Sequence, residues 1–254
     1  MRPIDAMSVL VTGGGSGIGE GIARHLAAAG ARVTISGRRP DRIDAVAGSI
    51  GEACRAVGGD VTVPADRTAM VAAAVEHGGG RLDALVNNAG NMYRGPLAEL
   101  DETELLALFH SNVVGAVMLT QAALPHLRES RGAVVFIGSV HSQRAFPGAS
   151  PYAATKGAVE TLTGVLAAEL GPDEVRVSCV RPGGVFTEIN QRAGLFDDET
   201  ARRRLEDLGP AHALGRIGTT AEVAEAVEYL VRAEWTTGSV LTVDGGLSLG
   251  VTSA

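Results

Sequence analysis

Basic blocks, cysteines and aromatic side chains are all scarce in this sequence of 254 residues, of which aromatics make up 4%. The densest basic cluster, residues 202–204, is flanked by acidic residues, and the net charge is −7 at pH 7. No nucleic acid is expected as a partner, because such a surface needs concentrated positive charge. The two cysteines, Cys54 and Cys179, lie among apolar residues, which predicts buried thiols in a reducing compartment rather than a disulfide.

Two further absences concern export and membranes. The first residues, M-R-P-I-D-A-M-S, contain no hydrophobic signal region, so the expected location is the cytoplasm. Residues 105–127 contain no Asp, Glu, Lys or Arg and are long enough to span a bilayer, yet they include polar residues such as His110, Asn112 and His126. We predict a long helix, buried within the protein or between subunits, and no membrane partner. No metal-ligand set is assigned.

What the chain has in abundance fits a close-packed α/β protein. Hydrophobic residues make up 45% of it, and 34 residues are glycine. Helical patterns alternate with strand-like runs, which place strands at residues 9–12, 31–36, 54–57, 83–86, 132–138, 175–180 and 240–243. This order predicts one domain, residues 1–254, with a doubly wound parallel sheet covered by helices on both faces.

Residues 9–20, V-L-V-T-G-G-G-S-G-I-G-E, join the first strand to the first helix through a glycine-rich turn. Gly13, Gly17 and Gly19 stand as G-x3-G-x-G, and glycine permits left-handed backbone conformations and a close approach to a ligand. The helix that follows presents free N–H groups and a positive dipole end, both suited to a pyrophosphate. Similar turns also occur without a ligand, so a purely structural role remains the alternative.

In sheets of this type, ligands bind beyond the carboxyl ends of the strands. The residues expected at those ends, and therefore in one crevice, are Gly13 to Gly19, Gly37 to Arg39, Asp60, Asn88 to Gly90, Ser139 and Pro182 to Thr187.

Three residues near this crevice form a candidate acid–base group. Tyr152 and Lys156 stand four apart at the start of a predicted helix, so their side chains share a face, and Ser139 follows the preceding strand. A cation beside Tyr152 would lower the pKa of its phenol from about 10, and Ser139 could donate to the same substrate oxygen. Such a set suits a carbonyl–alcohol pair. Each residue alone could be an ordinary surface residue, but their combination with the glycine turn favours the site.

Two other polar positions bear on the function. Asn112 stands in an apolar helical pattern, where it must find partners or leave a cost of about 1–3 kcal/mol, a demand that structure alone could explain. After the second strand, Ser36-Gly37-Arg38-Arg39 offers no carboxylate for a ribose hydroxyl, whereas an arginine accommodates a 2′-phosphate. The expected cofactor is therefore NADP(H), with NAD(H) possible. The alternative is that both arginines are solvated loop charges.

Taken together, the sequence resembles the short-chain dehydrogenase/reductase family over residues 8–246. The resemblance is carried by T-G-G-G-S-G-I-G at residues 12–19, N-N-A-G at 87–90, Asn112, Ser139, Y-A-A-T-K at 152–156 and R-P-G-G-V-F-T at 181–187. It implies a Rossmann fold, a homotetramer and a substrate-covering segment at residues 186–212. That segment matches no subgroup, so the substrate stays open.

The resemblance also implies residue roles. Tyr152 would be the catalytic acid–base group, Lys156 would bind the nicotinamide ribose and lower the pKa of Tyr152, Ser139 would position substrate, and Asn112 would hold a water in a proton relay. The implied cofactor contacts are Gly13, Gly15, Ser16, Gly17, Ile18, Gly19, Gly37, Arg38, Arg39, Asp60, Val61, Asn88, Ala89, Gly90, Tyr152, Lys156, Pro182, Gly183, Val185 and Thr187.

The expected function is an NADP(H)-dependent oxidoreductase that interconverts a ketone and a secondary alcohol of small size. Ser139, His141 and Tyr152 are expected to contact the substrate, and the pocket is expected to be bordered by His141, Asn91, Met92, Tyr93, Gln143 and Arg144. The alternatives are a cofactor-binding protein with a regulatory, non-redox role, and an epimerase or dehydratase that uses the same fold.

Overall fold

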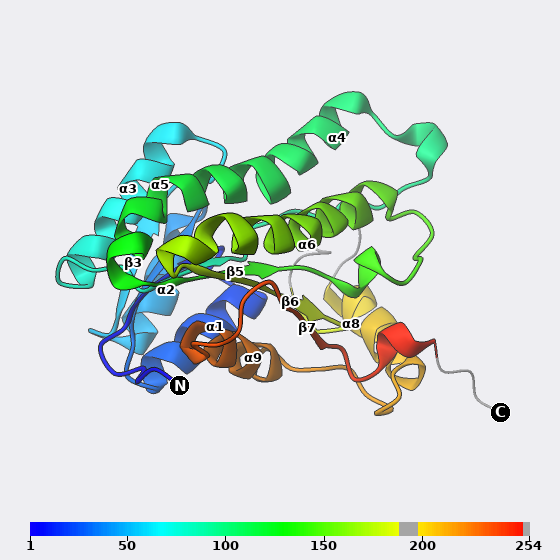
Figure 1. The fold of residues 1–254 in the computed structure, drawn as a ribbon. Helices are drawn as coiled ribbons and strands as arrows, with labels where there is room; N and C mark the ends of the chain where they lie inside the picture. The colour runs from blue at the N-terminus through cyan, green and yellow to red at the C-terminus, as the bar shows by residue number, and fades with distance from the viewer. Residues whose placement is uncertain (188–197, 251–254) are drawn as a thin grey trace.

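The computed structural model describes residues 1–187 and 198–250, and its centre is a seven-stranded sheet (Figure 1). All neighbouring strands pair in parallel, in the order β3-β2-β1-β4-β5-β6-β7. The strands are β1 (Ser8–Thr12), β2 (Arg32–Gly37), β3 (Cys54–Gly58), β4 (Ala84–Asn87), β5 (Ala133–Ile137), β6 (Arg176–Pro182) and β7 (Val240–Val243). The predicted doubly wound α/β fold is confirmed, with each strand within two residues of its expected bounds.

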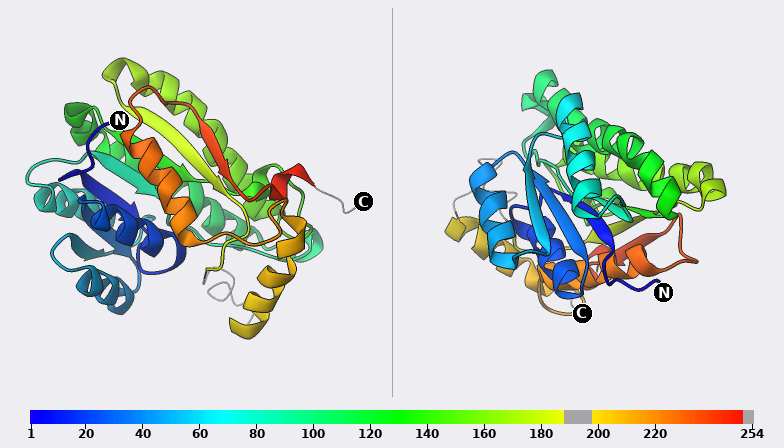
Figure 2. Two further views of the ribbon diagram at one scale, coloured as in Figure 1. Left: turned by 90° about the horizontal axis from the view of Figure 1, so that it is seen from below. Right: turned by 90° about the vertical axis from the view of Figure 1, so that its left-hand side faces the viewer.

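Helices cover both faces of the sheet (Figures 1 and 2). They are α1 (Gly17–Ala28), α2 (Pro40–Ile50), α3 (Pro64–His77), α4 (Glu102–Phe109), α5 (Gly115–Ser130), α6 (Ser150–Leu170), α8 (Asp198–Asp207) and α9 (Thr220–Arg232). One apolar cluster joins the sheet to α1, α2 and α9, and a second joins it to α3, α5 and α6.

Alternation along the strands explains why both faces are apolar. Val9 and Val11 of β1 belong to the cluster with Ile22 of α1, whereas Leu10 between them belongs to the cluster with Met70 of α3. Each residue of β1 is buried. A strand covered on both sides reads as a continuous apolar run, which is how these strands could be found in the sequence.

The direction of winding reverses between β1 and β4. From β1 the chain moves outward through β2 to β3, then returns to β4 beside β1 and continues to β7. In open α/β sheets a crevice forms at such a reversal, beyond the carboxyl ends of the strands. The glycine turn after β1 and the N-N-A-G segment after β4 therefore meet there.

The uncharged segment at residues 105–127 differs from the prediction in two ways. A π turn, His110–Val114, interrupts the helix between α4 and α5 and contains Asn112. Counted together with this π turn, the helical residues Glu102–Ser130 are long and apolar enough to cross a membrane by length and composition. Of their most apolar stretch of 18 residues, 39% is buried. Leu106 is 61% exposed in this chain. Of the two predicted settings, burial within the protein does not hold for the outer face of the helix, and burial between subunits stays a prediction.

Within residues 186–212, where the sequence shows little periodicity, the structure contains the short helix α8. Residues 188–197 of the predicted substrate-covering segment lie outside the described residues. The two cysteines are free and buried, Cys54 in β3 and Cys179 in β6, with four strands between them. That separation confirms the predicted thiols, because a disulfide needs Cα atoms within about 7 Å.

Candidate active site

The glycine turn after β1 forms a cradle that only glycine permits. Gly13 and Gly17 have φ angles of +67° and +57°, and a Cβ on Gly19 would lie 2.3 Å from the Gly13 carbonyl oxygen. Ser16, the residue before α1, makes no capping hydrogen bond with its side chain. The first N–H groups of α1 are therefore left for a ligand, as an anion site at a helix N-terminus requires.

Hydrogen bonds fasten this turn to the end of β4. Thr12 Oγ1 accepts from the backbone N–H groups of Asn88 and Ala89 at 3.1 and 2.9 Å, and Asn88 Nδ2 donates to the Thr12 carbonyl at 2.8 Å. The two segments that the sequence placed at one crevice are thus held in register by direct contacts. This confirms that the N-N-A-G segment lies beside the glycine turn.

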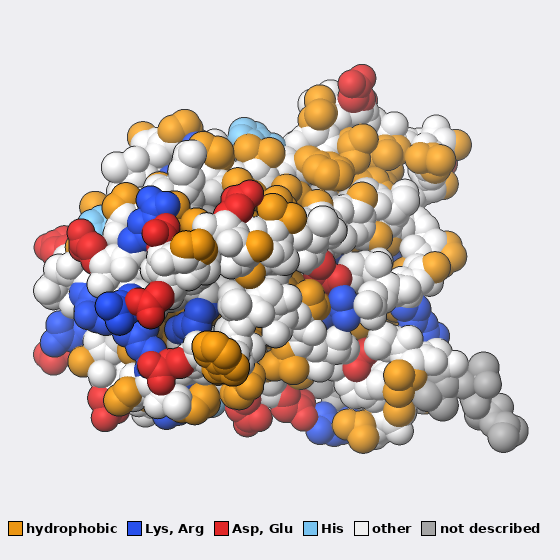
Figure 3. Space-filling view, viewed as in Figure 1, with side chains coloured by type: hydrophobic (Ala, Val, Ile, Leu, Met, Phe, Trp, Pro, Cys, Tyr) orange, Lys and Arg blue, Asp and Glu red, His pale blue; other side chains and the backbone are white. Residues whose placement is uncertain are grey.

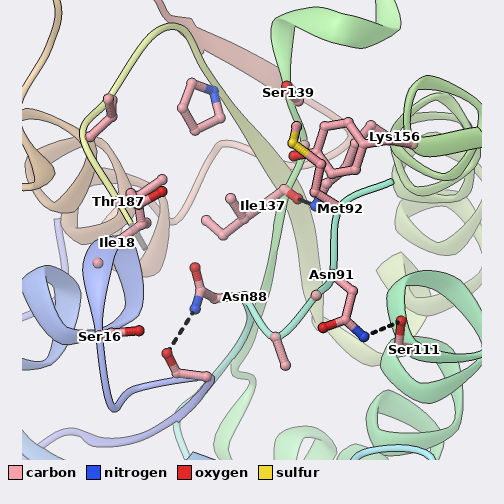
Figure 4. Close-up of a pocket in the computed structure, with 18 of the residues that line it drawn as sticks. Ser16, Ile18, Asn88, Asn91, Met92, Ser111, Ile137, Ser139, Lys156 and Thr187 are labelled. Carbon is pink, nitrogen blue, oxygen red and sulfur yellow. Dashed lines mark hydrogen bonds between the residues drawn. The ribbon is translucent and has the colours of Figure 1, made fainter. Parts of the chain in front are cut away.

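A cavity of about 640 Å³ opens along these strand ends, a size usual for a small-molecule or cofactor site. In Figure 4, Ser16, Ile18 and Thr187 lie on one side, Ser139, Lys156 and Met92 lie on the other, and Asn88 lies between them. All the predicted cofactor contacts line this cavity except Gly19. Gly19 packs behind the turn, against Gly13 and Asn88, so its glycine serves the close packing of the loop.

Ser139, Tyr152 and Lys156 meet at one end of the cavity. All three are buried. The side chain of Ser139 acts on Tyr152 and lowers the pKa of its phenol. Lys156 donates from Nζ to the Ile137 carbonyl at 2.7 Å and lies 5.6 Å from the centre of the Tyr152 ring. The structure therefore brings the predicted acid–base group together.

Burial dominates the titration of these groups. Burial raises the pKa of Tyr152 to about 12. The side chain of Ser139 lowers this pKa, but by less than burial raises it. Burial also lowers the pKa of Lys156 to about 8. Desolvation of the phenolate outweighs the effect of Ser139 in this cavity. The expected lowering of the pKa of Tyr152 by Lys156 stays a prediction.

His141 forms part of the same wall. Its Nδ1 lies 3.1 Å from Ser139 Oγ. Its ring stacks on that of Phe146 with 4.3 Å between the centroids, and it lies edge-to-face with the ring of Tyr152 with 5.2 Å between the centroids. Burial, together with the charges of Arg94 and Lys156, lowers the pKa of His141 to about 4. The imidazole is therefore neutral near pH 7.

Of the other residues expected at the pocket border, Asn91 and Met92 line the cavity, whereas Tyr93, Gln143 and Arg144 are not part of its described wall. Arg144 instead donates from Nη1 to the carbonyl of Leu247, a residue that does line the cavity, at 2.5 Å.

Asn112 lies behind the wall rather than in it. Its Oδ1 accepts from the Asn91 N–H at 2.8 Å, and its Nδ2 donates to the Asn91 carbonyl at 2.9 Å and to Thr155 Oγ1 at 3.1 Å. The side chain thus has the partners that its burial requires, and it ties the loop after β4 to α6. These hydrogen bonds make it a brace for the site. The proposed role in holding a water is not tested by these contacts.

Three arginines surround the far end of the cavity. Arg38 donates to Asn91 Oδ1 at 3.1 Å and lies 3.8 Å from Asp60 Oδ2, Arg39 donates to Ser16 Oγ at 3.2 Å, and Arg42 also lines the wall. Beside them Ser36 lines the wall with a buried hydroxyl that has no hydrogen-bond partner among residues 1–187 and 198–250. The glycine cradle, the uncapped helix and these arginines fit a phosphorylated dinucleotide.

Sequence reasoning missed several lining residues. Arg42 stands three residues after Arg39, one helical turn along α2, so helical spacing could have found it. Arg94, Phe146, Leu208 and Leu247 come from loops and short turns far apart in the chain, and no local pattern marks them. One missed signal is compositional: Lys156 is the only lysine in the sequence.

Comparisons with known proteins agree with this geometry. The sequence profile described as enoyl-(acyl carrier protein) reductase matches residues 13–248. L-fucose dehydrogenase from Bos taurus is 40% identical over 251 residues, covering 95% of this chain and 89% of its own length. Gluconate 5-dehydrogenase from Gluconobacter oxydans is 36% identical over 250 residues, covering 95% and 94%. The structure of 3-ketoacyl-(acyl-carrier-protein) reductase from Brucella melitensis, complexed with NADH, has a TM-score of 0.88 and 34% identity, over 96% of this chain and 99% of that one.

Proposed function

This chain belongs to the short-chain dehydrogenase/reductase family of NAD(P)-dependent oxidoreductases, and from that premise we propose that it interconverts a ketone and a secondary alcohol, with NADP(H) as its preferred cofactor and Tyr152 as its acid–base group. The observation that carries the proposal is the position of Ser139, Tyr152 and Lys156, buried together at one end of a cavity whose other end is the glycine cradle.

The site residues account for the proton in the reducing direction. A bound nicotinamide supplies the hydride to the carbonyl carbon. The carbonyl oxygen, which gains the electron pair of the C=O bond, takes the proton of the Tyr152 hydroxyl and leaves a tyrosinate. The pKa of Tyr152, raised by burial to about 12, keeps that proton in place until the oxygen becomes basic. Ser139 donates to the same oxygen, and the Lys156 ammonium stabilises the phenolate that forms.

The preference for NADP(H) is supported by charge at the adenosine end. Arg38, Arg39 and Arg42 line this part of the cavity, with Asp60 as the carboxylate among its described lining residues. Guanidinium groups form strong, charge-assisted hydrogen bonds with phosphate. Asp60, 3.8 Å from Arg38, weakens this preference in part, and the similar reductase from Brucella melitensis is complexed with NADH.

The names of the similar proteins favour a carbonyl–alcohol reaction on a polar substrate. Two are dehydrogenases, of L-fucose and of gluconate, and one is a reductase of 3-ketoacyl groups. A regulatory protein, or an epimerase or dehydratase, would give no net oxidation of NADPH. Assay of NADPH consumption against a panel of sugar-derived and acyl ketones separates these alternatives from the proposal.

Tyr152→Phe tests the acid–base role. The change removes the hydroxyl with little change in shape, so we expect turnover to fall by about 10²- to 10⁴-fold, the usual contribution of a general acid. Binding of NADP⁺, measured by fluorescence or calorimetry, should remain within a few fold of wild type. A kcat close to that of wild type in a variant that binds the cofactor would rule out the assignment.

A further inference from the structure

A buried ion pair lies directly behind the strand end that carries Ser139. Arg181 of β6 donates from Nε and Nη2 to the two carboxylate oxygens of Glu160 of α6, at 2.9 and 2.7 Å. The side chains are 9% and 11% exposed, so both members of the ion pair are largely removed from solvent. Desolvation offsets most of the attraction in such pairs. Stability alone therefore does not explain why this one is there.

The Glu160 carboxylate contacts the chain on both sides of Ser139. On one side, Ser142 Oγ lies 2.6 Å from Glu160 Oε1 and 2.7 Å from the Ser139 carbonyl oxygen. On the other, a Cβ on Gly138 would lie 2.9 Å from the same carboxylate oxygen, so the carboxylate packs against the backbone there. It thus supports the turn that presents Ser139 to the cavity.

The same carboxylate is the negative charge beside Lys156. Glu160 stands one helical turn after Lys156 on α6, and the other titratable groups that face Lys156 are Tyr152, Cys179 of β6 and His141. Burial lowers the pKa of Lys156, whereas negative charge on Cys179 or on Glu160 raises it. The pKa of Cys179 is itself raised by burial to about 12. Its thiol is therefore neutral near pH 7, which leaves Glu160 as the charged neighbour.

Among the lysine and arginine side chains of the sequence, Lys156 is also the one that can lose its proton readily. The sequence has 22 lysine and arginine residues, and every one except Lys156 is an arginine. A guanidinium stays charged at all accessible pH values, whereas a buried ammonium shifts its pKa easily. A charge placed to act on Lys156 therefore acts on a group that can respond.

We propose that Glu160, held by Arg181, is a positioning residue with two effects: through Ser142 it fixes the turn that carries Ser139, and its negative charge stabilises the ammonium form of Lys156. The proposal rests on the proposed function for its effect on turnover, but its electrostatic half concerns the titration of Lys156 alone. The two halves can be tested separately.

Nuclear magnetic resonance of the full chain, labelled with ¹³C,¹⁵N-lysine, tests the electrostatic half. Because the sequence contains one lysine, the labelled side chain gives one signal, whose titration midpoint is expected near pH 8. Glu160→Gln keeps the shape of the side chain and removes its charge, so the midpoint should fall by about one pH unit. The alkaline limb of the kcat profile should move in the same direction, with KM for the ketone changing less than kcat.

Ser142→Ala tests the positioning half. The change removes the hydroxyl between Glu160 and the Ser139 carbonyl but leaves the carboxylate charge in place. We expect kcat to fall by about 3- to 10-fold, while the midpoint of the lysine signal stays that of wild type. A wild-type kcat in Ser142→Ala would overturn this half.

Two further variants keep the test decisive. If Glu160→Gln does not fold because Arg181 is left without its carboxylate, Glu160→Gln/Arg181→Met removes both charges. A downward shift is still expected, because Glu160 is the carboxylate one helical turn from Lys156 on α6. Asp173→Asn is the matched control, since it removes the carboxylate of an exposed pair with Arg128, 2.7 Å apart, and should leave the midpoint unchanged.

An unchanged lysine midpoint in a folded Glu160 variant, with only its melting temperature lowered, would show that the ion pair is merely structural. Failure of the proposed function would look different. None of the ketones would then support oxidation of NADPH by the wild-type protein, while the lysine titration would still report on Glu160.

Discussion

Single residues set the protonation state in which the site rests. Near pH 7 the Tyr152 phenol is protonated, the Lys156 ammonium is mostly charged, and the His141 imidazole is neutral, because burial raises the pKa of Tyr152 to about 12 and lowers those of Lys156 and His141 to about 8 and about 4. This combination suits donation of a proton to a carbonyl oxygen. It also leaves His141 able to accept or donate a hydrogen bond without adding charge.

Arg38 carries the prediction about cofactor choice. Arg38→Ala should raise KM for NADPH by about 10- to 100-fold, because only the phosphorylated cofactor loses a charge-assisted contact of about 1.5–3 kcal/mol. KM for NADH should change by less than about threefold. Steady-state kinetics with both cofactors measure the difference.

The control for this experiment is Arg55→Ala. Arg55 of β3 pairs with Glu76 of α3 and lies outside the described wall of the cavity. It should leave both KM values unchanged. Equal effects of Arg38→Ala on the two cofactors, or a wild-type preference for NADH, would contradict the assignment.

Among the elements, the ends of α9 are secured in two different ways. Its start has a capping box, in which Thr219 and Glu222 exchange hydrogen bonds with each other's backbone N–H groups. Its end is held by Arg176 of β6, whose guanidinium donates to the carbonyls of Leu230, Val231 and Ala233 at 2.8–2.9 Å. A side chain from the sheet thus satisfies carbonyls that a helix end leaves without partners.

Replacement of Arg176 should therefore destabilise the protein from within. Arg176→Met leaves these buried carbonyls without donors, at a cost of about 1–3 kcal/mol for each buried polar group, so we expect a loss of about 3 kcal/mol and a melting temperature lower by about 6–12 °C. Thermal unfolding followed by circular dichroism measures the change.

Arg128→Met provides the comparison, since Arg128 is half-exposed in its pair with Asp173. Exposed pairs contribute about 0–1 kcal/mol, so this variant should melt within about 3 °C of wild type. A loss as large as that of Arg176→Met would show that the effect belongs to any arginine replaced by methionine.

For the whole molecule, one layer of helices is not fully covered. Apolar side chains gather on the surface over α4 (Figure 3), and exposed apolar residues of this layer include Leu106 of α4, Val114 of the π turn and Val165 of α6. Apolar surface of this kind favours contact with a second copy. We infer that the homotetramer expected from the family resemblance uses this layer.

Light scattering at micromolar concentration should accordingly give a mass about four times that of the 26.0 kDa chain. Leu106→Glu places a charge in the inferred interface and should reduce the mass to that of a smaller species. Val63→Glu, at an exposed position before α3, should leave the mass unchanged. A monomer in the wild-type sample would exclude the proposal.

Local rules in the sequence determined the fold class and most of the site. Buried strands read as short apolar runs between glycines, the turn at Gly13 and Gly17 demands left-handed backbone, and the spacing of Tyr152 and Lys156 places them on one face of a helix. These features depend on neighbours within a few residues. They could therefore be predicted without knowing the order of the strands.

The tertiary structure alone decided where side chains from distant segments meet. Asn112 and Gly19 lie behind the cavity wall, and Glu160, Arg181 and Ser142 converge behind Ser139, because strand order and helix packing bring their elements together. The direction of the pKa shift of Tyr152 also depended on the fold, since burial by the surrounding elements raises this pKa and outweighs the lowering effect of the Ser139 side chain. A local pattern contains neither the depth of burial nor the partners across the sheet, and both of these set the chemistry of the site.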